Sequence, residues 1–126
     1  MANGLDWRAG DNVIISSIEY PSNVYPWLNL QPRGVEVQSV EPCNGEICLD
    51  DFVSLMNSRT RLVSISSVQF SNGYRVDLEQ LSDICQRRNV LLNIDAIQHI
   101  GALDFDVSQY HIDFLSAGGH KWLLSP

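Results

Sequence analysis

Residues 77–95 read Asp-Leu-Glu-Gln-Leu-Ser-Asp-Ile-Cys-Gln-Arg-Arg-Asn-Val-Leu-Leu-Asn-Ile-Asp, and this stretch decides the fold because it predicts a helix followed by a buried strand. Asp77 can cap a helix over residues 77–88, with Gln80 as its reciprocal partner. A short, continuous apolar run over residues 90–94 then predicts a strand. The apolar stripe of the helix consists of Leu78, Leu81, Ile84 and Cys85.

The rest of the chain repeats this alternation of strand and helix patterns. Strands are also predicted over residues 12–17, 34–40, 61–66 and 112–116. Helices are predicted over residues 21–30, shortened or kinked by Pro26, over residues 49–56, and as a single turn over residues 96–100.

This alternation predicts an α/β fold with three layers, in which a mostly parallel sheet is covered by helices on both faces. Right-handed crossovers then bring the carboxyl ends of the strands to one edge of the sheet. Ligands of such sheets bind outside that edge, so the residues directly after each strand are the candidates for function.

Composition narrows the class of protein. The chain has 126 residues, a formal net charge of −7, 44% hydrophobic residues and 18% charged residues, which is typical of one globular domain. Basic residues are too few and too scattered for nucleic-acid binding. No run of 18 apolar residues predicts a membrane span, and no secretory signal is visible. The number of cysteines, three, is odd, which favours a protein of the reducing cytoplasm over one with a disulfide framework. The spacing of Cys43 and Cys48 fits no common zinc site.

Polar and aromatic side chains follow two of the predicted strands. Asp95 comes directly after the strand over residues 90–94, as either a helix cap or a ligand-binding carboxylate. Gln98 lies one turn further on and would point the same way, unless the turn is merely solvated. Tyr20 follows the first strand, where its ring could cover a planar ligand or pack at the rim.

The segment Ser116-Ala-Gly-Gly-His-Lys-Trp122 follows the last predicted strand. Its two glycines allow the backbone to pass close to a ligand, and His120 can donate to an anion. Lys121 is either a surface charge or, if its pKa is lowered, a nucleophile. A lysine, a carboxylate and an aromatic lid at one edge match pyridoxal phosphate, which needs a Schiff-base lysine and a carboxylate at its ring nitrogen.

Over nearly its whole length the chain resembles the fold-type-I pyridoxal-phosphate enzymes, specifically the class V aminotransferase and cysteine desulfurase family. The resemblance is carried by residues 10–23, 73–78, 95–101 and 113–122, which include Glu19-Tyr20, the Asp95-Ala-Ile-Gln98 segment and the His120-Lys121 pair.

The resemblance implies a role for each matching residue. Lys121 would hold the cofactor as a Schiff base and then move protons, while Asp95 would pair with the pyridinium nitrogen. Gln98 would bond the phenolic oxygen, His120 would contact the phosphate, and Tyr20 would stack on the ring.

Three positions depart from the desulfurase pattern. Tyr20 stands where desulfurases usually present His, Gly118 where they carry a phosphate-binding Ser, and Phe70 where they tend to have Asn. These departures favour an aminotransferase-like or lyase-like member. The phosphate would then be held by Ser116, His120 or another chain.

The resemblance further implies that residues 1–126 are the central part of the cofactor-binding large domain, without its N-terminal segment and without the C-terminal small domain. A stretch that reads as a helix end, Leu5–Gly10, agrees with such a fragment. The expected enzyme is a homodimer that acts on an amino acid or amine. The alternatives are a cysteine desulfurase or lyase of the same family, or an inactive truncated domain. A nucleotide-binding module is disfavoured, because no G-x-G-x-x-G follows any strand.

Overall fold

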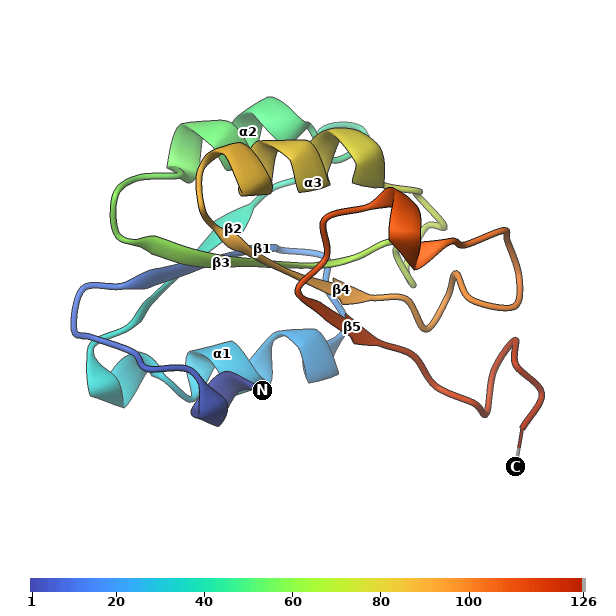
Figure 1. Ribbon diagram of the computed structural model, residues 1–126, viewed down its shortest axis with the longest axis horizontal. Coiled ribbons are helices and arrows are strands. Elements are labelled where there is room, and N and C mark those ends of the chain that lie inside the picture. The colour runs from blue at the N-terminus through green and yellow to red at the C-terminus, as the bar shows by residue number, and fades with distance from the viewer. Residues whose placement is uncertain (126) are drawn as a thin grey trace.

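The computed structural model describes residues 1–125 and contains one five-stranded parallel sheet with the strand order β2-β1-β3-β4-β5 (Figure 1). Every strand pairing is parallel, as the alternating pattern predicts. The strands are β1 (Asn12–Ser16), β2 (Glu36–Val40), β3 (Thr60–Ser66), β4 (Leu91–Asp95) and β5 (Phe114–Ser116).

Helices lie on both faces of the sheet, so the fold has the three layers expected. Helices α2 (Leu49–Leu55) and α3 (Leu78–Arg87) cover one face, and the short helix α1 (Tyr25–Leu28) lies on the other (Figure 1). Asp77 caps α3 by accepting a hydrogen bond from the Gln80 backbone N–H at 2.9 Å. Within residues 1–125, no helix is both long and apolar enough to cross a membrane.

Strand residues alternate between two apolar cores, because successive side chains of a strand point to opposite faces. The core under α2 and α3 includes Ile14, Phe52, Val63, Leu81, Cys85, Leu92 and Ile94. The core on the α1 face includes Trp7, Val13, Ile15, Trp27, Leu30 and Leu62.

Strand register aligns the carboxyl ends that carry the candidate site. Ser66 pairs with Asp95 across β3 and β4, and Asp95 pairs with Ser116 across β4 and β5. Near this edge the α1 face of the sheet changes from apolar to polar, because Ser64, Ser66, Asn93 and Asp95 occupy alternate positions of β3 and β4.

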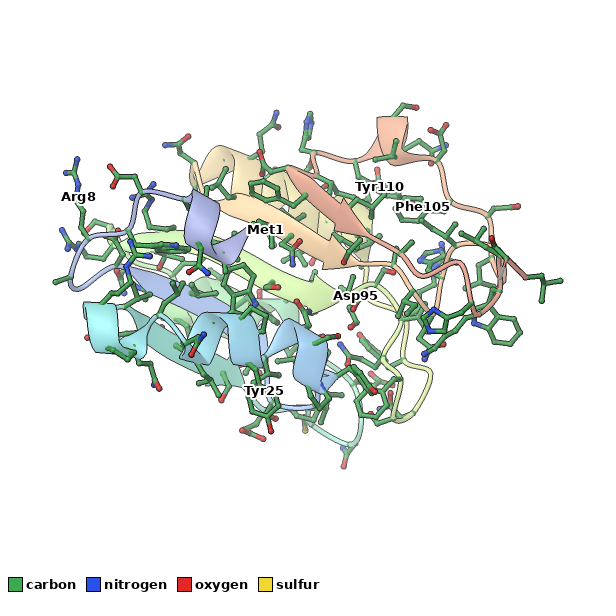
Figure 2. The ribbon with its side chains drawn as sticks, turned by 90° about the horizontal axis from the view of Figure 1, so that it is seen from below. Met1, Arg8, Tyr25, Asp95, Phe105 and Tyr110 are labelled. Carbon is green, nitrogen blue, oxygen red and sulfur yellow. The ribbon has the colours of Figure 1, made fainter. Side chains whose placement is uncertain are left out.

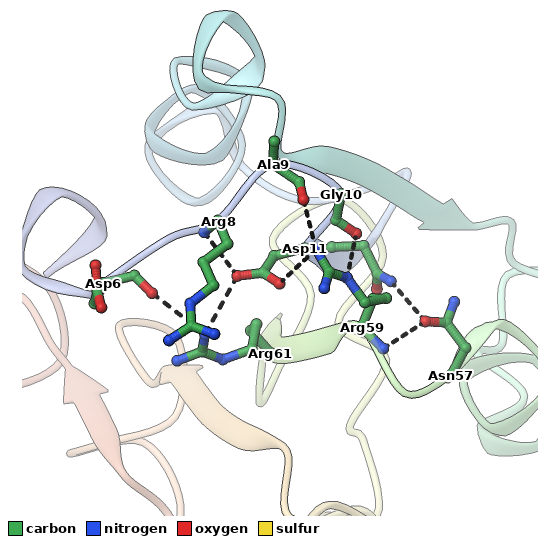
Figure 3. Close-up of polar contacts among 9 residues, drawn as sticks. Asp6, Arg8, Ala9, Gly10, Asp11, Asn57, Arg59 and Arg61 are labelled. Carbon is green, nitrogen blue, oxygen red and sulfur yellow. Dashed lines mark hydrogen bonds and ion pairs between the residues drawn. The ribbon is translucent and has the colours of Figure 1, made fainter.

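A polar clamp holds the opposite end of the sheet (Figure 3). The buried carboxylate of Asp11 accepts a hydrogen bond from the Arg8 backbone N–H at 2.9 Å. It also lies 3.2 Å from Nη1 of Arg61 and 3.6 Å from Nη2 of Arg59. The loop before β1 is thereby tied to the start of β3.

Three local predictions have different outcomes in the structure. Residues 21–30 form a 3₁₀ segment, Pro21–Asn23, and then α1, because prolines at 21 and 26 lack the N–H that a continuous helix requires. Residues 96–100 form the single turn that was predicted, since the Ile100 backbone N–H donates to the Ala96 carbonyl at 3.0 Å, the i to i+4 spacing of a helix. The Leu5–Gly10 stretch is no helix end, since the 3₁₀ segment Ala2–Gly4 precedes it and Gly10 turns the chain at φ 85°.

Candidate active site

Asp95 ends β4 with its side chain almost fully buried, near the middle of the molecule and away from Arg8 at the opposite end (Figure 2). Its Oδ1 accepts a hydrogen bond from the Ile97 backbone N–H at 2.9 Å. Among the described residues Oδ2 makes no hydrogen bond. The carboxylate therefore serves as the local cap and still keeps one oxygen for a ligand.

The turn after Asp95 is packed against the segment that carries the lysine. The Ala96 backbone N–H donates to the Ser116 carbonyl at 2.7 Å. Further along, Nε1 of Trp122 donates to Oε1 of Gln98 at 3.3 Å. Two segments that lie 24 residues apart in sequence thus meet at the edge of the sheet, as the sequence analysis expects of them.

Two glycines allow this close approach. A Cβ added to Gly101, whose φ is +92°, would lie 2.7 Å from the Trp122 carbonyl oxygen. A Cβ added to Gly118 would lie 2.7 Å from Cδ1 of Ile97. Both distances are shorter than real Cβ contacts. At Gly101 the obstacle is backbone, so a side chain there would push the lysine segment away from the turn, whereas at Gly118 the end of the Ile97 side chain would have to move.

A pocket of about 700 Å³ opens beside Asp95 on the α1 side of the sheet. Asp95 and His120 line it, together with Ser116, Gly118 and Asn23. The pocket lining does not include Tyr20, Gln98 or Lys121. Lys121 is half-buried and directly follows the pocket-lining residue His120 in the sequence. The side chain of Gln98 is turned toward Trp122. The structure therefore gathers the five predicted residues at one edge, but only two of them face this pocket.

Tyr20 lies at the same edge in contact with a second aromatic residue. Its ring meets that of Phe70 edge to face, with centroids 5.1 Å apart and an angle of 84° between the planes. Tyr20 is 49% exposed and Phe70 is 46% exposed, so the pair is a surface feature rather than part of the core. An exposed aromatic pair beside a carboxylate can cover a planar ring.

A buried polar cluster that was not predicted from the sequence lies beneath Tyr20. At its centre, Glu19 is 6% exposed and accepts hydrogen bonds from donors on three residues. Polar residues at alternate positions of apolar strands were the signal that could have revealed it, because buried polar groups need partners. The cluster consists of Glu19, Asn23, Ser64, Ser66, Gln69 and Asn93.

One histidine of the turn is fully buried and is not among the predicted residues. His99 packs edge to face on Phe105 with centroids 5.0 Å apart, and its Nε2 lies 3.3 Å from the Asp104 carbonyl oxygen. Burial lowers the pKa of His99, the Asp104 hydrogen bond opposes this, and the charge of Arg75 lowers the pKa further. The neutral ring is therefore the form that suits the folded state.

The three cysteines lie away from the pocket. Cys85 is buried in α3, as the apolar stripe predicts, and burial raises its pKa to about 12, with the charge of Asp113 adding to the rise. Cys43 and Cys48 are exposed and free. Among residues 1–125 there is no group of three or more His, Cys, Asp and Glu side chains that could hold a metal ion.

Comparisons with known proteins show the family to which the sequence is related. The family model of the class V aminotransferases matches residues 1–126. A probable cysteine desulfurase of Methanothermobacter thermautotrophicus is 35% identical over 130 residues, covering the whole chain and 32% of that protein. The chain therefore spans about a third of the length of this curated relative.

Solved structures show the same fold. The cysteine desulfurase CsdA of Escherichia coli superposes with a TM-score of 0.88 at 26% identity, over 94% of this chain and 30% of that one. The cystine C–S lyase C-DES, solved with its reaction product cysteine persulfide, superposes with a TM-score of 0.91 over 99% of this chain and 35% of that one. At 24% identity, the second likeness concerns the fold alone.

Proposed function

The chain belongs to the class V aminotransferase family, and we propose that it forms the part of an amino-acid-processing enzyme that binds the cofactor and carries its lysine. The family's cofactor is pyridoxal 5′-phosphate. The observation that carries the proposal is the packing of the Asp95 turn against the lysine segment, through the Trp122–Gln98 hydrogen bond and the glycine contacts.

The residues at this edge suit the cofactor chemically. Asp95 offers one unengaged carboxylate oxygen in a nearly dry position, which suits a protonated ring nitrogen. Ser116 and His120 line the same pocket and can donate hydrogen bonds to a phosphate. Gly118, which also lines the pocket, leaves the backbone of this segment accessible to the phosphate. Lys121 is the only lysine of the chain, so the covalent attachment has a single candidate side chain.

Each residue then has a defined task. Asp95 would hold a proton on the ring nitrogen, and bound pyridoxal phosphate supplies a ring that accepts electrons from the substrate carbon. Because Oε1 of Gln98 accepts from Trp122, its Nε2 is left to donate to the phenolic oxygen. Lys121 Nζ would remove and return the proton at the substrate Cα. Tyr20 would cover one face of the ring.

Borohydride trapping tests the proposal. The chain is incubated with pyridoxal phosphate, reduced, and mapped by peptide mass spectrometry. We expect one pyridoxyl adduct, on the peptide with Lys121, and none in Lys121→Ala. Because the chain holds no other lysine, the amino terminus is the rival site. Labelling at the amino terminus alone, or no labelling, would contradict the proposed attachment.

A matched pair of carboxylates tests the role of Asp95. Asp113 lines the same pocket, and its Oδ2 accepts a backbone hydrogen bond from Leu92 at 2.8 Å, much as Asp95 accepts from Ile97. Asp95→Asn can keep its backbone hydrogen bond but loses the charge, so we expect cofactor affinity to fall about tenfold or more. Asp113→Asn should leave that affinity unchanged. Equal losses of cofactor affinity in the two variants would contradict the pairing of Asp95 with the ring nitrogen.

For the substrate, we propose an amino acid and select cysteine as the first to test, because the desulfurase named among the relatives acts on it. This relative favours a cysteine desulfurase, whereas Tyr20, Gly118 and Phe70 favour an aminotransferase-like or lyase-like member. Product analysis of the enzyme that contains this chain separates the possibilities. From cysteine, alanine indicates a desulfurase and pyruvate a lyase, whereas amination of an added 2-oxo acid indicates an aminotransferase. The homodimer that the resemblance implies is tested on the same sample by light scattering.

A further inference from the structure

Glu19 is the most heavily bonded buried carboxylate at the carboxyl edge of the sheet. Its Oε1 accepts from the Ser66 backbone N–H at 2.8 Å and from Nε2 of Gln69 at 2.6 Å. Its Oε2 accepts from the Ser66 hydroxyl at 2.6 Å and from Nδ2 of Asn23 at 2.8 Å. All four partners are donors, so the carboxylate joins the chain after β1 to the chain after β3.

The same two segments are joined a second time at the surface. Glu19 is followed by Tyr20, and Gln69 is followed by Phe70. The first residue of each pair is buried and hydrogen-bonded, and the second is exposed and in aromatic contact. The inner bond therefore sets the spacing of the two backbones from which the aromatic rings project.

The buried cluster also reaches the strand that carries Asp95. Asn23, which donates to Glu19, accepts a hydrogen bond from the Ser64 hydroxyl. Nδ2 of Asn93 donates to Oγ of Ser64 at 2.7 Å. Because Asn93 lies two residues before Asp95 on β4, both side chains point to the same face of the sheet.

We propose that Glu19 is a positioning residue that fixes the Tyr20–Phe70 pair relative to Asp95, and so fixes how Tyr20 lies on the cofactor ring. The proposal rests on the proposed function. Each ring is about half-exposed, and their mutual contact is the only aromatic contact that either makes among the described residues, so the spacing of the two backbones beneath them decides how the rings meet. The carboxylate beneath supplies the missing constraint through the backbone.

The test compares two buried carboxylates at opposite ends of the sheet. Glu19→Gln keeps the shape but turns one acceptor oxygen into a donor that faces the donors of Ser66 and Asn23. Asp11→Asn makes the same chemical change in the clamp at the other end, where it loses partners of similar kind. Any general loss of stability should be shared by the two variants, whereas a positioning effect belongs to Glu19→Gln alone.

The first readout needs no cofactor. In protein with ¹³C-labelled tyrosine, the Tyr20 ring resonances are shifted by the ring current of Phe70 and are assigned with Tyr20→Phe. We expect Glu19→Gln to move them toward the values in Phe70→Leu, and Asp11→Asn to leave them in place. Unmoved Tyr20 resonances in folded Glu19→Gln would overturn the proposal, even if cofactor binding were lost.

The second readout uses pyridoxal phosphate. We expect Glu19→Gln to weaken its binding about tenfold, the equivalent of one lost hydrogen bond, and to reduce the circular dichroism induced in each bound cofactor. Equal losses in Asp11→Asn would mean that Glu19 acts through stability alone. If Glu19→Gln fails to fold, Gln69→Met, which removes one of the four donors to Glu19, gives both readouts. Failure of Lys121 trapping in the unmodified chain would count against the proposed function but not against the resonance result.

Discussion

The carboxylate of Asp11 lies 3.2 Å from Nη1 of Arg61, at the end of the sheet opposite to Asp95. The side chain of Asp11 is 5% exposed, whereas that of Arg61 is 39% exposed, so the ion pair is screened on one side. The Asp11 carboxylate also accepts a hydrogen bond from the Arg8 backbone N–H, which adds to the stabilisation by the ion pair. This cluster stabilises the fold without touching the candidate site.

We therefore expect Asp11→Asn to lower the free energy of unfolding by about 1–2 kcal/mol, since the Arg8 bond can survive while the charge is lost. Urea unfolding gives this value, and borohydride trapping at Lys121 should be unchanged. Asp104→Asn is the control and should leave the unfolding midpoint nearly unaltered, because Asp104 is exposed and its carboxylate makes no hydrogen bond or ion pair among the described residues. Equal midpoints for the two variants would show that the clamp contributes nothing.

The buried ring of His99 makes stability depend on pH. Its pKa is lowered in the folded state, so the unfolded chain binds a proton more readily once the pH falls below about 6.5. The stability that the neutral ring allows is complete above that pH and is lost as the pH falls through it. We expect this dependence to flatten in His99→Asn, measured as urea midpoints between pH 8 and pH 5.

The control for this experiment is His111→Asn, because His111 is exposed and, among the described residues, its ring has a hydrogen-bond contact with the Gln86 side chain alone. That variant should keep the pH dependence of the unmodified chain. A flattened profile in His111→Asn, with an unaltered one in His99→Asn, would contradict the assignment to the buried ring.

The three thiols should react at two very different rates. Cys43 and Cys48 are exposed, whereas burial raises the pKa of Cys85 to about 12. At pH 8 only about one Cys85 thiol in ten thousand is ionised, and the thiolate is the reactive form. A colorimetric disulfide reagent should therefore titrate two thiols in the native chain and three in guanidinium. In Cys85→Ala, both counts should be two.

Gly101 tests the packing of the lysine segment. Gly101→Ala places a Cβ 2.7 Å from the Trp122 carbonyl oxygen on a backbone with φ +92°. Gly73→Ala has a similar φ, +72°, but no heavy atom within 4 Å of the new Cβ. We expect both variants to lose about 1–3 kcal/mol of stability through backbone strain.

Only Gly101→Ala should also reduce the yield of the Lys121 adduct, because only there does the new methyl group displace the lysine segment. Quantitative peptide mapping after borohydride reduction measures that yield. A similar reduction in Gly73→Ala would attribute the effect to stability and not to the contact with Trp122.

Much of the fold was predictable because its signals are local. The helix over residues 77–88 has a capping aspartate and one apolar stripe, and the structure places both as expected. The helix predicted over residues 21–30, shortened or kinked by Pro26, is reduced to the four residues of α1, whereas the 3₁₀ segment that begins at Pro21 was not predicted.

The candidate site was predictable only in part. Asp95 and the lysine segment follow strands, and the parallel sheet brings their backbones to one edge. The rotamer of Gln98, which turns its oxygen to Trp122, depends on a contact between segments that no local pattern contains. The role of Glu19 was hidden for the same reason, since its partners Ser66 and Gln69 lie 47 and 50 residues further along the chain.

The all-parallel pairing also governs how the molecule acquires this site during folding. No two neighbouring strands are joined by a hairpin, so each pairing closes a long loop before it gains any hydrogen bond. Such high contact order slows folding. The three-residue strand β5 pairs with β4 alone among the described strands. We therefore expect the amides of β5 to exchange with deuterium sooner than those of β1 and β3. The segment that carries Lys121 would then unfold locally while the hydrogen bonds at the centre of the sheet remain intact.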